Sequence, residues 1–429
     1  MVDIKFNGCR LEMQLEAQSP MIHFQNRQPG ATIRATEVKP KLDRFILRGL
    51  QKTTGKDIRE LRGDSEYGGI FTDKDHEALN YRMQLDASGQ PYSIVNVGDT
   101  RAHEYDIFYG NTAEMRRAHK ELRGIFSNPK LTILCFNEKL RSLIEQYIGE
   151  FFLVMNFGTM QGKGFGSFAP AGLLPAGGQL DTGIQAEIAR YLKAATGSAR
   201  CYCMRFGAVP SGQQEKNDYC NRIFGEIKSF YSIMKSGQNF SGYSRAYIYQ
   251  YMHVRGTDNR NNAGDVSIDN EKAWMKQNGI SPALAKPENE RRTDRKDENP
   301  RYVRALLGTA GAVTYQASFE NRRDRTTVQI TDMGTDKLER VASPIFFKIV
   351  GNVVFITARE VPDEIYDREF AFSNKENGRK ATIKTPSRDD FKSGKFDIQS
   401  FLASYVDYYN VEARKKLKNI SRNARVEEV

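Results

Sequence analysis

Residues 137–168 read NEKLRSLIEQYIGEFFLVMNFGTMQGKGFGSF, an apolar helical pattern followed by three alternating glycines. Apolar residues recur every three or four positions in the first half, and Asn137 is a favourable helix N-cap. The spacing predicts a helix over 137–156. The run LTILCF at 131–136 precedes this helix and predicts a strand. A strand, a helix and a glycine-rich turn therefore follow one another.

The glycine-rich segment 158–168 has residue types that bind nucleic acid. Glycines let the backbone approach a phosphate closely, Lys163 adds positive charge, and Phe165 can stack on a base. The segment is not a P-loop, because G-x-x-x-x-G-K-[ST] is absent, and not a dinucleotide fingerprint, because it follows a helix. A turn that only connects helix and strand is the alternative. The candidate binding residues are Gly162, Lys163, Gly164, Phe165, Gly166 and Ser167.

A second basic candidate lies toward the N-terminus. Residues 8–17 alternate apolar and polar, which predicts a half-buried strand. Residues 31–50, ATIRATEVKPKLDRFILRGL, predict a loop that enters a helix. Helix starts are favourable places for backbone phosphates. The basic residues clustered there are Arg34, Lys39, Lys41 and Arg44. A solvated helix face is the alternative interpretation.

On the C-terminal side, the Pro/Gly/Ala-rich run APAGLLPAGG at 169–178 predicts a linker. We therefore expect domains at 1–175 and 176–429. The second domain repeats the series of strands and helices, with helices predicted at 182–194 and 217–234, strands at 200–206, 243–253 and 326–331, a hairpin at 344–357, and a helix with a basic end at 398–429. Residues 256–300 form a long polar insertion, the composition of a solvated or disordered segment.

Composition narrows the class of protein. The chain has 429 residues with 64 Lys+Arg against 53 Asp+Glu, a formal charge of +11. Such an excess suits an acidic partner such as nucleic acid, although it also suits plain solubility. No apolar stretch reaches the roughly 20 residues of a membrane span, and the N-terminus lacks a signal-peptide pattern. With five scattered cysteines, this predicts a cytoplasmic protein with reduced thiols.

Four motifs together resemble one family. In chain order they are LEAQSPMIHF at 15–24, GATIRATEVKPK at 30–41, GKGFGSF at 162–168 and RVASPIFFKI at 340–349. Their order resembles the RAMP superfamily of CRISPR effector subunits and is most similar to the two-domain subunits of type III complexes.

The resemblance implies an α+β fold of tandem ferredoxin-like (RRM-like) βαββαβ domains, with a glycine-rich loop that contacts guide RNA. It also implies guide RNA (crRNA), complementary target nucleic acid and other CRISPR effector subunits as partners. Its late motif corresponds to Arg340, Ser343 and Pro344 here, and Arg340 joins the candidate RNA-binding residues. The aromatic signature of ordinary RRM domains is missing, so backbone and loop contacts are expected rather than base stacking on the sheet.

Two other functions stay open. Some RAMP proteins cleave RNA, and His23 or the loop from Asp73 to His76, which includes Asp75, could play that part. The histidines are dispersed, so we assign no catalytic residue. A protein-interaction cap that uses residues 256–300 as a contact arm is the other function.

Three cysteines raise the question of a metal. Cys201, Cys203 and Cys220 could supply three zinc ligands, but no fourth ligand stands at standard spacing. Buried thiols are the better interpretation. We expect no metal and no cofactor.

Overall fold

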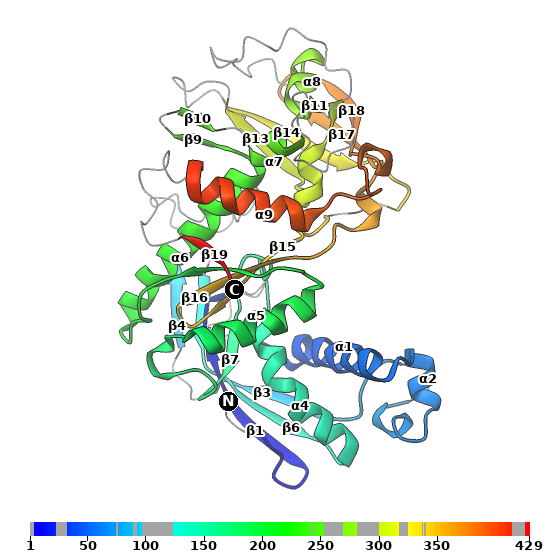
Figure 1. Ribbon diagram of the computed structural model, residues 1–429, viewed down its shortest axis with the longest axis vertical. Coiled ribbons are helices and arrows are strands. Elements are labelled where there is room, and N and C mark those ends of the chain that lie inside the picture. Colours follow the sequence, from blue (N-terminus) through cyan, green and yellow to red (C-terminus); the bar gives the residue numbers. More distant parts are fainter. Residues whose placement is uncertain are drawn as a thin grey trace.

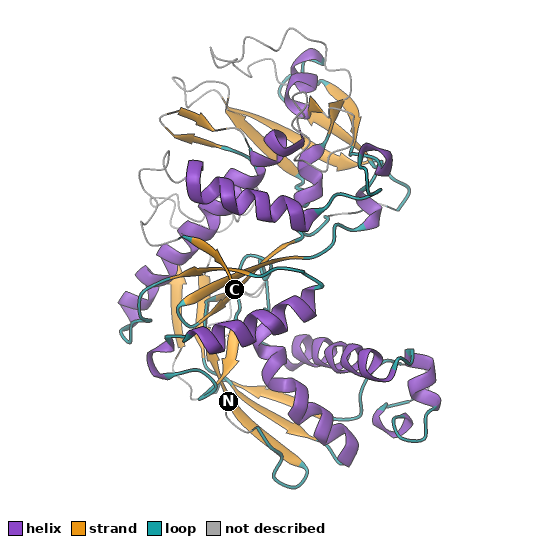
Figure 2. Ribbon diagram, in the orientation of Figure 1, coloured by secondary structure: helices purple, strands orange, loops and turns teal. Residues whose placement is uncertain are grey.

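The computed structural model describes residues 4–22, 32–73, 76–88, 92–96, 123–240, 242–244, 246–252, 269–280, 300–316, 325–336, 338, 340–413 and 425–429. Helices and sheets are mixed, and all three four-stranded sheets are antiparallel. This confirms the predicted α+β class. The three sheets succeed one another along the long axis of the molecule, from bottom to top in Figures 1 and 2.

The first sheet has the strand order β3-β6-β1-β7. Its strands are β1 (Arg10–Ala17), β3 (Arg82–Asp86), β6 (Lys130–Leu134) and β7 (Phe168–Pro170), with α1 (Ala35–Thr54) between β1 and β3 and α4 (Glu138–Val154) between β6 and β7. Shorter elements are β2 (Met21–Ile22), α2 (Ile58–Gly63), η1 (Gly68–Ile70), β4 (Tyr92–Asn96) and β5 (Arg123–Ser127), and β2, β5 and β4 form a small separate sheet.

The two helices form where the apolar pattern predicts them. In α1, the buried residues Val38, Leu42, Ile46 and Leu50 share one face, and Gly55 ends the helix in the left-handed conformation that glycine tolerates. In α4, the Asn137 side chain accepts a hydrogen bond from the Leu140 amide at 2.9 Å. The helices cover one face of the sheet and form a core with it.

The second sheet has the order β15-β16-β8-β19. Its chain order is β8 (Tyr202–Arg205), α6 (Gln213–Lys235), β15 (Ile345–Val350), β16 (Val353–Ala358), α9 (Ile398–Tyr408) and β19 (Val426–Glu428). Strand, helix, two strands, helix and strand thus recur, with the same spatial order as in the first sheet. The helix α5 (Thr182–Thr196) lies between the two series and packs on both α4 and the second sheet.

The third sheet, β13-β14-β17-β18, consists of segments that interrupt the second series. Its strands are β13 (Ala312–Gln316), β14 (Arg325–Asp332), β17 (Glu369–Asn374) and β18 (Lys380–Lys384). Around it lie β9 (Gln238–Phe240), β10 (Gly242–Ser244), α7 (Tyr247–Met252), β11 (Asp269–Asn270), α8 (Glu271–Gln277), β12 (Pro300–Arg301), η3 (Val303–Leu307), η4 (Asp363–Ile365) and η5 (Arg388–Asp390).

A buried charge network joins these surrounding elements. Glu271, at the start of α8, is fully buried and forms an ion pair with Arg304 of η3. The hydroxyl of Tyr249 donates a hydrogen bond to the same carboxylate at 2.5 Å. Close by, the ammonium of Lys235, at the end of α6, donates to the carbonyls of Leu307 at 3.2 Å and Gly308 at 2.6 Å.

The burial of Lys235 predicts a pH dependence of stability. Desolvation, followed by repulsion from Arg304, lowers the pKa of Lys235 to about 7. Above pH 7 the folded state therefore holds one proton fewer than the unfolded state at this lysine, and stability rises with pH until the unfolded lysine also titrates. We expect the urea midpoint to increase from pH 7 to pH 9, and to increase less in Lys235→Met. An equal rise in both proteins would contradict this assignment.

Two sequence predictions for the second domain are wrong. The Tyr-rich segment 243–253 is not one strand, because residues 247–252 form helix α7. Tyr247 and Tyr251, one helical turn apart, pack against Phe401 of α9 at centroid distances of 5.8 and 5.2 Å. The helix predicted for 398–429 does not reach the end of the chain, because residues 426–428 form β19, which pairs with β8. Helical structure is described from Ile398 to Ala413, and residues 414–424, which hold most of the predicted basic end, lie outside the described residues.

Toward the N-terminus, the aromatic and β-branched residues of YGGIF at 67–71, YSIVNV at 92–97 and YDIFY at 105–109 predict short strands. The second is found as β4, whereas residues 68–70 form a short 3-10 helix and residues 105–109 lie outside the described residues.

Candidate nucleic-acid interface

The glycine-rich segment lies between α4 and β7, and several of its backbone amides donate hydrogen bonds inside the protein. Lys163 N–H donates to Met160 O at 2.8 Å, and Gly166 N–H donates to Pro20 O at 3.0 Å. The Ser167 amide donates to the hydroxyl of Ser19 at 2.9 Å. These three amides are therefore already hydrogen-bonded inside the protein and are not available to a phosphate.

The segment also joins the first sheet to the second. The Phe347 amide of β15 donates to Gly162 O at 3.2 Å, and the Asn156 side chain donates to Phe347 O at 2.8 Å. The hydroxyl of Ser167 donates to Ile349 O at 2.5 Å.

The fully buried ammonium of Lys348 donates to two carbonyls at the end of α4, Phe152 O at 2.8 Å and Met155 O at 2.6 Å. We call this set of contacts between α4, the glycine-rich segment and β15 the clasp.

The two side chains predicted to hold RNA point into the protein. The Lys163 ammonium is buried, has no hydrogen-bond acceptor among the described residues and lies over the Tyr231 ring, 2.8 Å from its centroid. Burial holds the pKa of Lys163 well below its usual range. Phe165 is fully buried and stacks on Phe224 of α6, with 4.0 Å between ring centroids. No face of the Phe165 ring is open to a base.

The glycines serve the same packing. Gly164 and Gly166 have φ angles of +90° and +66°. A Cβ on Gly166 would lie 1.9 Å from the carbonyl oxygen of Phe157, whereas a Cβ on Gly162 would meet nothing within 4 Å. The predicted RNA contacts of this segment stay untested, and the geometry gives its residues an internal role.

The four basic residues of the N-terminal candidate lie on α1 or at its start, but they differ in their surroundings. Lys39 binds Asp43 at 2.8 Å and Leu79 O at 2.9 Å. Lys41 binds Glu37 at 2.9 Å and the Asn156 carbonyl at 3.1 Å. Arg34, the N-cap residue, and Arg44 are exposed. The structure thus brings the four onto one element and leaves two of them on its surface.

Two further arginines, absent from the sequence prediction, lie near Arg44. Arg48 is exposed one helical turn after Arg44 on α1. Arg359 directly follows β16, with its guanidinium over the Phe346 ring at 4.9 Å. Arg359 is exposed, yet partial desolvation of its guanidinium, and then repulsion from Arg48, lowers the pKa of Arg359. The sequence signal that could have revealed Arg48 was its helical spacing from the basic residues at positions 41 and 44. No sequence pattern indicates that residue 359 lies near α1.

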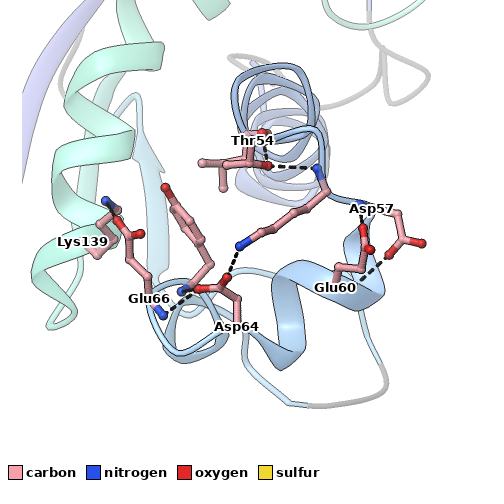
Figure 3. A network of polar contacts seen from close by, with 9 residues as sticks. Thr54, Asp57, Glu60, Asp64, Glu66 and Lys139 are labelled. Atoms are coloured by element: carbon pink, nitrogen blue, oxygen red, sulfur yellow. Dashed lines mark hydrogen bonds and ion pairs between the residues drawn. The ribbon is translucent and has the colours of Figure 1, made fainter.

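Two lysines, one just after α1 and one at the start of α4, are paired with acids. Lys56 forms an ion pair with Asp64, and Lys139 forms one with Glu66; Asp64, Glu66 and Lys139 are labelled in Figure 3. Asp64 also accepts a hydrogen bond from the Glu66 amide at 2.7 Å. This network ties the segment of α2 to the end of α1 and to the start of α4. The exposed arginines of α1 lie away from it, in the middle of the helix.

Arg340 is exposed before β15 and forms no ion pair with a described carboxylate. His23 and Asp75, named for the endoribonuclease alternative, lie outside the described residues, as does most of 256–300. His76 is exposed and its Nδ1 lies 3.0 Å from the Asp73 carboxylate. The nuclease and interaction-cap alternatives stay predictions.

The cysteines considered for zinc are separated. Cys201 and Cys203 lie in the core beside α5, whereas Cys220 lies in the core around α6. Burial raises the pKa of the three thiols to about 12, 11 and 12 respectively. Among the described residues, no group of three or more His, Cys, Asp and Glu side chains could hold a metal ion. No helix in the described part of the chain is long and apolar enough to span a membrane.

Comparisons with known proteins agree over both halves of the chain. Residues 8–238 match the family model of the Cmr1 N-terminal domain, and residues 243–426 match that of the Cmr1 C-terminal domain. Among solved structures, the chain is similar to the crystal structure of Cmr1 from Pyrococcus furiosus in its apo form. That pair has 12% sequence identity and a TM-score of 0.33, over 58% of this chain and 79% of the other. No curated protein matches the chain.

Proposed function

Because the chain belongs to the Cmr1 family, a RAMP family of type III CRISPR effector subunits, we propose that it binds guide RNA within such a complex. The surface that supports this proposal is the positive patch formed by Arg44, Arg48 and Arg359. In this proposal the protein is a non-catalytic subunit in the cytoplasm. It helps to assemble the complex and to recognise target nucleic acid together with other effector subunits.

The positive patch has the chemistry of a phosphate site. None of its three arginines forms an ion pair with a described carboxylate, and Arg44 donates from Nε only to the carbonyl of Pro40 at 3.1 Å. Guanidinium groups bind phosphate oxygens in pairs of parallel hydrogen bonds. Arginines that lie together without an acid repel one another, and an anion bound between them relieves this repulsion. The grouping of the three arginines without a described carboxylate is the observation that carries the proposal.

The patch combines residues of both halves of the chain, since Arg44 and Arg48 belong to α1 and Arg359 follows β16. The recurring order of strands and helices supports tandem ferredoxin-like domains at 1–175 and 176–429. RNA held by the patch would contact both. Because phosphate contacts carry no sequence information, binding should tolerate different guide sequences.

Removing two arginines tests the proposal. We expect Arg48→Ala/Arg359→Ala to weaken binding of a guide-length RNA about tenfold or more and to lower the slope of log affinity against log salt by about 2. Fluorescence anisotropy of labelled RNA across a salt series measures both quantities.

Lys375→Ala/Lys380→Ala is the matched control, because both lysines are exposed around the distant β17–β18 turn. Equal affinity of the arginine variant and the control would overturn the proposal.

A further inference from the structure

The first sheet has one face that no described element covers. Side chains alternate along each strand, so Leu11 and Leu131 face the helices in a core while their neighbours face outward. Across the three strands β1, β6 and β3, the residues Arg10, Leu134 and Arg82 are paired in one row. All three are exposed.

An aromatic ring lies just beyond this row, two residues after Leu134. Phe136 follows β6 and is 82% exposed, the largest exposed fraction among the described large hydrophobic residues that lie on the surface. Cys135, between Leu134 and Phe136, is fully buried, and its amide donates to Cys9 O at 2.9 Å. The Cys135 amide continues the pairing of the strands, and the Cys135 side chain lies in the core. Because side chains alternate, those of Leu134 and Phe136 lie on the open face.

The backbone around Phe136 is fixed. Arg141 of α4 donates to the Phe136 carbonyl at 3.2 Å. The next residue, Asn137, caps α4 and also donates from its side chain to Gly69 O at 3.0 Å. An exposed ring on a fixed backbone loses little conformational freedom when a flat ligand stacks on it.

The charges beside the ring favour an anion. Arg82 has no carboxylate partner among the described residues. Arg10 pairs with Glu12, and the same carboxylate also binds Lys130 at 3.0 Å. Asp86 stands opposite Lys130 at the other end of β3, so two arginines and one carboxylate of the described strands lie at the end of the face nearer Phe136. An exposed aromatic ring two residues beyond the row that carries two arginines complements a ligand that has both a flat base and a phosphate.

We propose that Phe136 is a stacking site for an unpaired nucleotide of single-stranded RNA, with Arg10 and Arg82 binding the neighbouring phosphates. The inference rests on the proposed function in that RNA is the ligand. It adds a contact on the side of the first sheet opposite α1, and hence a surface separate from the positive patch.

A single-tryptophan protein tests this site directly. The chain has one tryptophan, Trp274, which is buried and packs edge-on against Phe372 at 5.8 Å. In full-length Trp274→Phe/Phe136→Trp, the only tryptophan would lie at the proposed site. We expect an oligouridine or oligoadenine RNA of eight nucleotides to quench its fluorescence saturably, and Arg82→Ala in the same background to weaken this titration several-fold.

Affinity gives a second readout. Phe136→Ala should weaken binding of the same oligonucleotides about tenfold, whereas Phe136→Tyr should retain it. Met333→Ala is the matched control, since Met333 is another exposed hydrophobic residue, 46% exposed. Thermal melting of each variant shows whether the fold is retained.

The outcomes separate this inference from the proposed function. In one outcome, anisotropy shows that RNA binds while RNA fails to quench the introduced tryptophan and Phe136→Ala binds as tightly as the unchanged protein. In that case the stacking site is wrong and the proposal of the positive patch stands. If Arg48→Ala/Arg359→Ala binds guide RNA weakly while quenching persists, the stacking site is supported independently. If the complex formed by Phe136→Ala lacks a protein subunit but binds RNA normally, the surface around Phe136 binds protein and this inference is overturned. Absence of all RNA binding overturns both proposals.

Discussion

Alanine at position 166 will destabilise the protein by about 3 kcal/mol or more, because the added Cβ cannot be accommodated. It would lie 1.9 Å from the carbonyl oxygen of Phe157, a residue whose own amide donates to Gly166 O at 2.9 Å. The φ angle of +66° adds strain for any residue with a side chain. The amides of Phe157 and Gly166 also take part in the hydrogen bonds that align the segment. Urea unfolding at equilibrium measures the loss.

Gly162→Ala is the control for this prediction. Position 162 has open space around a Cβ, and its φ angle lies outside the left-handed region. We expect the free energy of unfolding to change by less than about 1 kcal/mol. If the two alanine variants unfold at the same urea concentration, the glycine-rich segment does not have the packing role that its contacts indicate.

Glu271→Ala will destabilise the protein by about 3–5 kcal/mol, because it leaves Arg304 buried without its counter-ion. Arg304 is 3% exposed and Glu271 is fully buried, so water cannot replace the lost carboxylate. The Tyr249 hydroxyl also loses its acceptor. Denaturant unfolding measures this change.

The double variant Glu271→Ala/Arg304→Met distinguishes this cause from the loss of packing. Removing both charges should recover a large part of the stability, since neither charge then stays buried alone. Asp363→Ala is the comparison at the surface, where the carboxylate binds Arg388 at 2.8 Å and Lys395 at 3.2 Å in contact with water. It should cause little change. A double variant as unstable as Glu271→Ala would show that packing dominates.

Local patterns predicted the helices and most strands, because amphipathic spacing reflects which face is buried. Helix 137–156 was found at Glu138–Val154, and the hairpin at 344–357 was found as β15 and β16. The segment 243–253 failed because its tyrosines pack on a distant helix, α9. Tertiary packing there outweighs the strand preference of tyrosine.

The candidate site shows the limit of sequence patterns more clearly. Glycines, a lysine and a phenylalanine in one segment suit a nucleic-acid loop, but the same residues also suit a tight junction in a core. The feature that distinguishes the two is strand β15, whose Ile349 carbonyl accepts a hydrogen bond from Ser167 across 182 positions of the chain. Arg359 was missed for the same reason, since its nearness to Arg48 follows from the packing of the second sheet beside α1.

The clasp has a consequence for how the protein is made. The Asn156 side chain binds Phe347 O across a separation of 191 residues, and Lys348 closes the end of α4 across a similar distance. At synthesis rates of about 5–20 residues per second, the later residues leave the ribosome roughly 10 to 40 s after the earlier ones. During that interval the end of α4 and the glycine-rich segment lack their partners. A nascent chain thus exposes this apolar junction to chaperones until β15 arrives.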